Sequence, residues 1–313
     1  MNKQAGFITY LFVMVIAAAL VLVGLYVWQT THFGINFSTA PADYGTAPNT
    51  LLNFGGSSNT SSSGSNTSGP NSPYTGLLSL SSGSAESSYQ PTDEYIEISN
   101  NSSSPVDISG WTLQNAFGNR PIQTTGNQAV HVAPEKVTIP LGTNFLDPSG
   151  NFAVGPIILA PGDTAIVTTG GPFVAYPFKI STSFRVNECA GYLNYTYPFD
   201  PSIDNICPAP QNEPGIDSIT DVCYQYVKDI PTCYDPSVQD KANLKDNFQP
   251  NCIGYIETHF NYAACVQNHE NDADFNKPTW RVFLGLSHEL WHEPDDSIKL
   301  LDRQGRIVDE IDY

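Results

Sequence analysis

The chain is poor in charge, and positive charge is the scarcer sign. Only 14% of its 313 residues are charged, and 31 acidic side chains outnumber 13 basic ones, which gives a formal net charge of −18. Such a surface repels phosphate backbones, so we expect no nucleic-acid partner. The sequence has no Gly-rich phosphate-binding loop either, which leaves nucleotide binding without support. Its 24 glycines and 24 prolines are typical of a loop-rich β protein rather than a helical one.

The sequence also lacks any Cys-x-x-Cys pair, a common signature of a structural zinc site. Cys265 and His269 stand at i, i+4, a spacing that suits one metal on a helix, but no second close pair completes four ligands. Asp272-Ala-Asp274-Phe-Asn276 mimics the start of an EF-hand loop, yet the next residue, Lys277, stands where the turn glycine belongs. We therefore expect a solvated acidic loop there, no bound metal and no cofactor.

Cysteines are confined to one part of the chain. All six fall between residues 184 and 279, at Cys189, Cys207, Cys223, Cys233, Cys252 and Cys265. An even number clustered in a loop-rich segment predicts a disulfide framework in an exported protein. Six cysteines allow 15 pairings. We expect local pairing, 189–207, 223–233 and 252–265, because short loops close at the lowest entropic cost.

Charge is missing altogether from Gly6 to Trp28. This apolar run exceeds the roughly 20 residues that span a bilayer as a helix, so residues 7–28 are predicted to be a transmembrane helix. Lys3 precedes it and no basic residue follows before Arg120, which favours a cytoplasmic N-terminus (1–6) and an extracytoplasmic C-terminal part at the cell surface. Cleavage as a signal peptide is one alternative. Another rests on Lys3-Gln-Ala-Gly-Phe7, which resembles the start of type IV pilin-like proteins.

Residues 29–88 contain no Lys or Arg and are dominated in their middle by Ser, Asn, Gly and Thr. A segment of this composition buries too little apolar surface to offset the entropy of ordering. We expect a disordered linker between the membrane helix and a globular domain at 89–313.

The globular part opens with a clear strand pattern. Residues 94–99 alternate, with Ile96 and Ile98 on one face, and turn residues follow from Asn100 to Pro105. Val106 resumes the alternation, and the phase flips at Ser109-Gly110, so that Trp111 and Leu113 point to the opposite face. This pattern predicts a hairpin whose second strand bends around a buried Trp111.

The run from Ile96 to Leu113 resembles the opening of the lamin tail domain, a small immunoglobulin-like β-sandwich. Leu159 to Val167 resembles its turn-then-strand element, and Ile298 to Tyr313 resembles its closing hairpin. The Cys-rich segment at about 186–279, which the resemblance does not cover, is expected to be a disulfide-rich, partly helical insertion between sandwich strands, in addition to the one transmembrane helix. The resemblance itself implies an all-β fold, an immunoglobulin-like β-sandwich. It implies a non-enzymatic binding or structural module with a protein or cell-envelope partner. We expect the insertion to be the contact surface and to be separable from the sandwich.

Further short elements follow from turn-bounded patterns. The strand candidates are residues 129–132, 136–139, 152–154, 157–159, 164–169, 280–284 and 298–301, and the helix candidates within the insertion are 216–227 and 258–267.

One motif resembles an active site. Ser287-His288-Glu289-Leu290-Trp291-His292 contains H-E-x-x-H, which in zinc peptidases places both histidines on one helical face with the Glu as base. Gly285 and Pro294 leave barely two turns for that helix, and strand patterns flank it. We therefore expect a connection between strands. A membrane-tethered zinc hydrolase using His288, Glu289 and His292 is the alternative function, and a pilin-like surface subunit is another.

Overall fold

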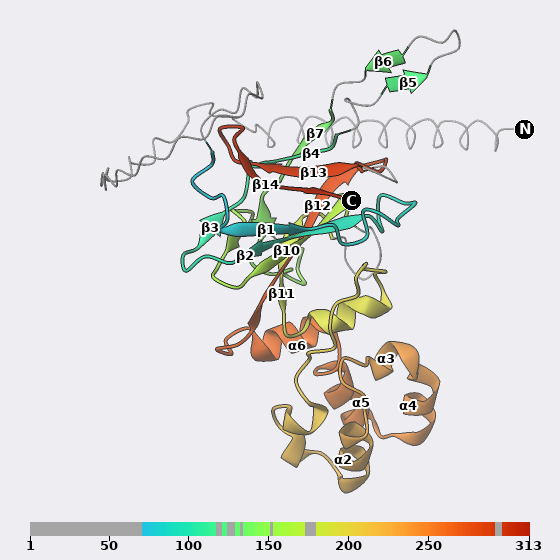
Figure 1. Cartoon of the computed structure of the whole chain (residues 1–313). Coiled ribbons are helices and arrows are strands. Elements are labelled where there is room, and N and C mark those ends of the chain that lie inside the picture. Colours follow the sequence, from blue (N-terminus) through green and yellow to red (C-terminus); the bar gives the residue numbers. More distant parts are fainter. Residues whose placement is uncertain are drawn as a thin grey trace, which may run out of the picture. The chain divides into compact units, whose positions relative to one another are not determined.

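Two β-sheets packed face to face form the body of the domain (Figure 1). The structure, a computed structural model, describes residues 71–116, 121–123, 129–131, 134–150, 153–172, 180–291 and 296–313. The larger sheet has six strands in the order β1-β2-β10-β12-β11-β8, namely β1 (Leu78–Ser81), β2 (Tyr95–Asn100), β10 (Thr164–Gly170), β12 (Asn276–Leu286), β11 (Ser183–Asn187) and β8 (Gly142–Thr143). Within it, β10 and β12 are parallel, whereas β2 is antiparallel to both β1 and β10.

The smaller sheet has four strands in the order β14-β13-β4-β7, namely β14 (Ile307–Asp312), β13 (Ser297–Leu301), β4 (Thr112–Gln114) and β7 (Lys136–Thr138). Two further antiparallel pairs are β3 (Val106–Asp107) with β9 (Ile158–Leu159), and β5 (Pro121–Gln123) with β6 (Ala129–His131). The closing hairpin is confirmed, because β13 pairs with β14 in antiparallel register.

The predicted opening strand is confirmed, but its partner is not the one expected. β2 pairs with β1 and β10, whereas the chain after the turn divides into β3 and β4, which pair outside the six-stranded sheet. The chain turns toward the four-stranded sheet at Gly110, just before β4. The φ of Gly110 is +76°, which lies in the left-handed region that favours glycine. The predicted hairpin is therefore wrong. A turn signal shows that the chain reverses, but in a sandwich the next strand commonly belongs to the other sheet.

The linker prediction is wrong for residues 71–88. Leu78 begins β1 opposite Asn100 of β2, and both Leu78 and Ala85 are buried. Ser72 Oγ donates a 2.8 Å hydrogen bond to Asp302 Oδ2, far along the chain. The serine-rich composition of this segment gave no indication of a strand. β1 is a short strand at the edge of its sheet, and two inward-facing side chains are enough to pack it beside β2. The remainder of the predicted linker and the predicted helix at 7–28 lie outside the described residues.

None of the helices in the described part of the chain is long and apolar enough to cross a membrane. Among the strand candidates, Ala153 and Val154 of the 152–154 segment form no strand, and residue 152 lies outside the described ranges.

Trp111 is buried in the core between the two sheets, as predicted, with 2% of its surface exposed. Its ring centroid lies 4.9 Å from that of Tyr74. The same cluster takes apolar side chains from both sheets, including Ile96, Ile98, Val167, Val282, Leu113, Ile298, Leu300 and Val308. In β2, Ile96 and Ile98 are fully buried and the residues beside them are half-buried. This alternation in burial corresponds to the alternation of apolar residues in the sequence.

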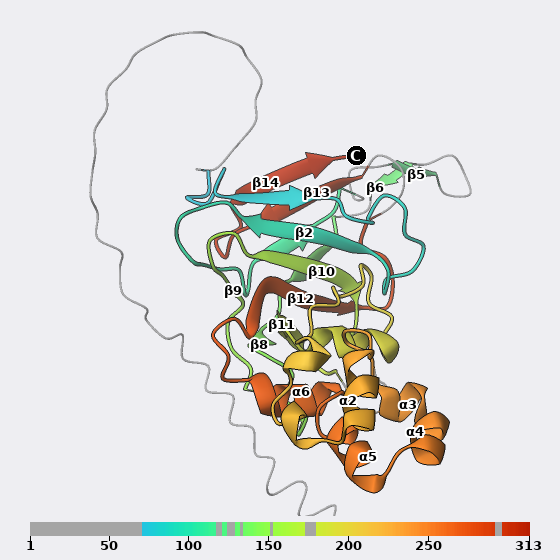
Figure 2. The same cartoon turned by 90° about the horizontal axis from the view of Figure 1, so that it is seen from below.

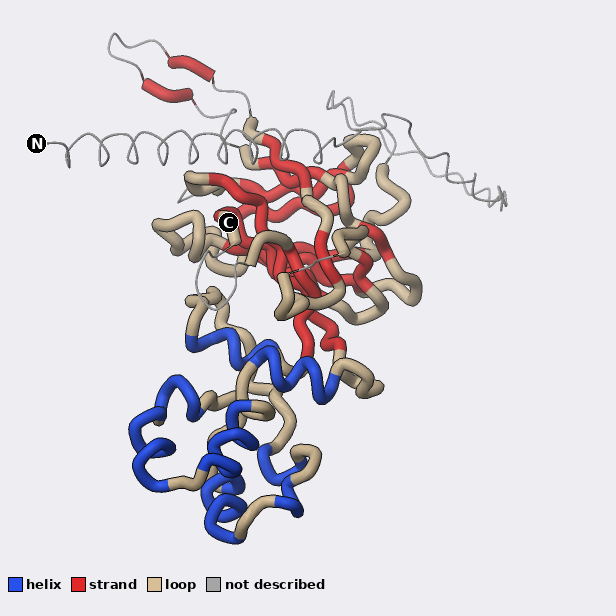
Figure 3. The backbone as a smooth tube through the Cα atoms, turned by 180° about the vertical axis from the view of Figure 1, so that it is seen from behind, coloured by secondary structure: helices blue, strands red, loops and turns tan. Residues whose placement is uncertain are grey.

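The insertion connects two neighbouring antiparallel strands, β11 and β12. Its helices gather away from the smaller sheet, as Figures 2 and 3 show. They are the 3₁₀ helices η2 (Ala190–Tyr195), η3 (Pro210–Asn212) and η4 (Ile216–Ser218), and the α-helices α2 (Asp221–Lys228), α3 (Pro236–Gln239), α4 (Lys241–Asn247), α5 (Pro250–Glu257) and α6 (Tyr262–His269). The two helix candidates thus correspond to η4 with α2, and to α6.

The insertion shares a core with the sandwich. Phe184 and Val186 of β11 and Phe283 of β12 pack in one cluster with insertion residues such as Tyr197 and Val266. A second cluster, around Cys223 and Cys252, belongs to the insertion alone. β12 therefore contributes to both cores, with Trp280 and Val282 in the first and Phe283 in the second. This shared packing argues against the expectation that the insertion is separable.

All six cysteines form disulfides, as predicted, but with other partners. The bonds are Cys189–Cys265, Cys207–Cys233 and Cys223–Cys252. Local pairing is therefore wrong. Loop-closure entropy grows only logarithmically with loop length, so tertiary packing decides the pairing. Cys223 of α2 and Cys252 of α5 lie in one buried cluster, and α6 packs beside η2.

Proteolytic mapping of the unreduced protein should recover three linked peptide pairs, 189–265, 207–233 and 223–252, because these pairs have Cα separations of 5.3–5.7 Å. Alkylation without reductant, read by intact mass, should add nothing. A linked peptide joining Cys189 to Cys207, or a labelled thiol, would contradict this framework.

Candidate binding site beside Trp280

The H-E-x-x-H segment contains no helix in its described part. Strand β12 ends at Leu286, and residues 287–291 form neither helix nor strand. His288 is half exposed, and its Nε2 lies 2.9 Å from Oε1 of Glu135. His292 lies outside the described residues. The arrangement that zinc peptidases use, with two imidazoles on one helical face, is therefore not formed by residues 287–291.

What holds this segment is a buried carboxylate. Backbone N–H groups of Leu290 and Trp291 donate to the two carboxylate oxygens of Glu94, at 2.8 and 3.1 Å. Glu94 is fully buried. Burial raises the pKa of Glu94 from its ordinary 4.5 to about 7, against the lowering effect of its hydrogen bonds. The connection after β12 is thus anchored to the start of β2.

This raised pKa predicts that the protein loses stability as pH rises from about 4.5 to about 7, because over that range the unfolded chain releases the Glu94 proton more readily than the folded one. The loss is at most on the order of 3 kcal/mol. Urea unfolding of wild type and Glu94→Gln at pH 5 and pH 8 measures it. Glu94→Gln should flatten the pH dependence, whereas the half-buried neighbour Glu97→Gln should leave it unchanged. Equal slopes in wild type and Glu94→Gln would remove Glu94 as the cause.

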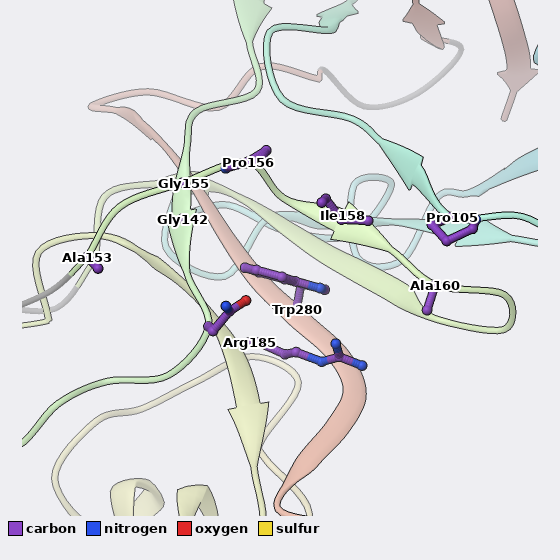
Figure 4. Close-up of a pocket in the computed structure, with 10 residues that line it drawn as sticks. Pro105, Gly142, Ala153, Gly155, Pro156, Ile158, Ala160, Arg185 and Trp280 are labelled. Carbon is purple, nitrogen blue, oxygen red and sulfur yellow. The ribbon is translucent and has the colours of Figure 1, made fainter.

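A recess of about 360 Å³ lies at the edge of the six-stranded sheet (Figure 4). Figure 4 shows the indole of Trp280 at its centre, with Gly142 and Gly155 on one side and the guanidinium of Arg185 on the other. The apolar wall consists of Pro105, Pro156, Ile158 and Ala160. Five separate parts of the chain, near β3, β8, β9, β11 and β12, therefore supply the recess.

Trp280, which lines this recess, carries an indole N–H that the described residues leave unpaired. The side chain is 1% exposed, and its Nε1 is buried without a hydrogen-bond partner among the described residues. A buried N–H left unpaired costs about 1–3 kcal/mol. A β-carbon at Gly142 would lie 3.1 Å from Cζ3 of Trp280 and 3.0 Å from the carbonyl oxygen of Ser183, so a larger residue would require these neighbours to move by a few tenths of an ångström.

Arg185 is held in a fixed position beside the indole. Its Nε donates to the carbonyl oxygen of Lys277 at 2.8 Å, and its Nη2 lies 3.1 Å from Oδ2 of Asp163. A fixed guanidinium and an indole N–H that the described residues leave unpaired suit a hydrogen-bond acceptor, such as a carbonyl or carboxylate, attached to an apolar group.

Sequence reasoning did not select Trp280 or Arg185 as site residues. The alternation at 280–284 shows a strand with Trp280 on one face. It does not show that β12 lies between β10 and β11, nor that Gly142 passes over the ring. These neighbours are set by pairing across the insertion, which no local pattern in the chain encodes.

Part of the chain matches a protein-family model, whereas the search of curated proteins found no match. The match begins in β1 and ends in the first turns of the insertion, so it includes the strands β2 to β11 but not β12, β13 and β14, which complete the two sheets. Residues 79–196 match the family model of the Lamin Tail Domain, in agreement with the β-rich fold of two packed sheets.

Proposed function

We propose that residues 71–313 are a non-enzymatic binding module, displayed outside the cytoplasm and held at the membrane by the predicted helix at 7–28. The observation that carries the proposal is the recess lined by Trp280 and Arg185, together with the Nε1 of Trp280, for which the described residues offer no hydrogen-bond partner. The Lamin Tail Domain match supports an interaction module on an immunoglobulin-like scaffold. Three disulfides suit an oxidising compartment, where exported proteins fold.

The partner is a protein or another cell-envelope component that presents a hydrogen-bond acceptor on an apolar segment. Binding would supply the acceptor that Trp280 lacks, and the half-exposed Ile158 would pack on the apolar part of the ligand. The net charge of −18 makes a nucleic-acid partner unfavourable.

Trp280→Phe tests the recess most directly, because it keeps an aromatic ring in the core and removes only the N–H and part of the ring. Cross-linking to the cell envelope, followed by quantitative recovery of the partner, should fall at least tenfold for Trp280→Phe combined with Arg185→Gln. Circular dichroism melting of the variant excludes simple unfolding. Undiminished recovery by a folded double variant would rule the recess out.

A second contact surface, on the insertion, is favoured by exposed apolar side chains. Val222 on α2 and Val238 on α3 are 70% and 74% exposed. Val238→Ser therefore serves as the matched comparison in the cross-linking experiment. If Val238→Ser abolishes recovery while the recess variant retains it, the insertion is the contact surface.

The topology has its own test. Protease added to intact cells should remove a C-terminal tag, because the apolar run after Lys3 favours a cytoplasmic N-terminus. A protected tag would reverse the orientation. A native chain beginning at Phe7 would support the pilin-like alternative.

A further inference from the structure

We propose that the insertion binds a divalent metal ion through Glu188, His269 and Asp272. One ligand atom from each of these three side chains lies within 4.8 Å of the other two. These residues are distinct from the His288 motif and from the recess beside Trp280.

A disulfide holds two of the three ligands in place. Glu188 follows β11 directly and precedes Cys189, and His269 closes α6 one turn after Cys265. The Cys189–Cys265 bond joins these two segments, with their Cα atoms 5.7 Å apart. Asp272 lies one short turn beyond His269, and its backbone N–H donates to the carbonyl oxygen of His269 at 2.9 Å. The three side chains are therefore preorganised by covalent and backbone links, and binding orders little that is not already fixed.

Glu188 supplies the observation that points to a ligand. Its side chain is 9% exposed, and its Oε1 is buried without a hydrogen-bond partner in the described part of the chain. The other oxygen, Oε2, lies 3.7 Å from Nζ of Lys277. A carboxylate oxygen shielded from water and left unpaired is costly, and a cation among Glu188, His269 and Asp272 would satisfy it.

The two nitrogens of His269 already face carboxylates on opposite sides. Nδ1 lies 2.8 Å from Oδ2 of Asp272, and Nε2 lies 3.2 Å from Oε2 of the buried Glu213. Metal-bound histidines commonly donate their second N–H to a carboxylate, which fixes the ring and its tautomer. Glu213 fits that supporting role at Nε2, which leaves Nδ1 on the side of Asp272 for the ion.

The donor set indicates the class of metal. An imidazole nitrogen with two carboxylates suits Zn²⁺ or Mn²⁺, whereas Ca²⁺ and Mg²⁺ prefer all-oxygen sites. Cys265, four residues before His269, does not serve as a further ligand, because it is in a disulfide and its sulfur is not a free thiolate. The ion would tie the end of α6 to the end of β11.

Metal titration of the full-length protein tests the site. Protein stripped with EDTA is titrated with ZnCl₂, MnCl₂ or CaCl₂, and bound metal is measured by mass spectrometry alongside thermal unfolding. We expect one equivalent of Zn²⁺ or Mn²⁺, a higher melting temperature on binding, and much weaker binding of Ca²⁺. Glu188→Gln and Asp272→Asn should each weaken binding at least tenfold.

His259→Gln is the matched control, because His259 also lies in the insertion but stacks on Tyr255, with ring centroids 4.0 Å apart, outside the cluster. It should bind metal as wild type does. Asp272 has a side chain 49% exposed, so Asp272→Asn should fold even if His269→Gln does not. Binding that survives both Glu188→Gln and Asp272→Asn, or no stoichiometric binding at all, overturns the proposal. Loss on His288→Gln with retention in Glu188→Gln would place the metal at the H-E-x-x-H motif instead.

Discussion

Trp111→Ala should abolish the cooperative unfolding transition of the 71–313 domain. The indole is 2% exposed between the two sheets, against Tyr74 and beside the point where the chain crosses from one sheet to the other at Gly110. Truncating a buried tryptophan typically costs about 3–5 kcal/mol, through lost transfer energy and the cavity left behind. That is a large part of the roughly 5–15 kcal/mol that stabilises a domain.

Urea unfolding followed by intrinsic fluorescence and by far-ultraviolet circular dichroism measures this effect. Tyr89→Ala removes a large aromatic side chain that is 80% exposed, and it should leave the transition within about 0.5 kcal/mol of wild type. A Trp111→Ala variant that unfolds cooperatively with a loss below about 1 kcal/mol would show that the core is organised around other residues.

Replacing residues 188–275 by a short Gly/Ser loop should destabilise the sandwich severely. Loop shortening by itself is inexpensive, because closure entropy depends only logarithmically on length. The cost arises on the sheet, where Phe184, Val186 and Phe283 would lose the side chains that now cover them. Each such exposure costs about 1.5–3 kcal/mol.

The measurement is the melting temperature and the oligomeric state of the shortened protein. We expect a markedly lower melting temperature and self-association through the uncovered face. Polar replacement of Phe184 and Phe283 in the same shortened protein should restore a monomer. If the simple deletion melts as wild type does and remains monomeric, the insertion contributes nothing to the sandwich.

Local patterns in the sequence predicted strands well. Alternation around Ile96 and Ile98 located β2, and the phase flip placed Trp111 in the core. The closing hairpin was located by the resemblance of Ile298 to Tyr313 to the end of the lamin tail domain. The neighbours of each strand within the sheets were predicted poorly. Whether β2 pairs with the next strand or with β10 depends on which distant segments of the chain meet in the fold. A period-two pattern indicates a strand but does not indicate which strand lies beside it.

For the candidate sites too, local motifs were visible in the sequence, whereas the residues that the fold brings together were not. The H-E-x-x-H spacing was visible in the sequence, but residues 287–291 form no helix in the fold. His269 was considered only with Cys265, its neighbour along a helix, whereas the fold places it against Glu188 and Glu213, 81 and 56 positions earlier in the chain. The recess at Trp280 depends on Gly142, which became a neighbour only through the order of strands in the sheet.

The Cys189–Cys265 bond also bears on the order in which the chain folds. β11 and β12 are adjacent in the sheet, yet the insertion separates them in sequence, and long separations slow the pairing of strands. The bond bypasses 76 residues of that separation, and each doubling of loop length costs about 0.6 kcal/mol on closure. Once oxidised, β11 and β12 meet almost as a local hairpin. In a reducing environment the same step would be a slow, long-range search, so we expect oxidation of Cys189 and Cys265 to precede completion of the six-stranded sheet and to set the rate of refolding.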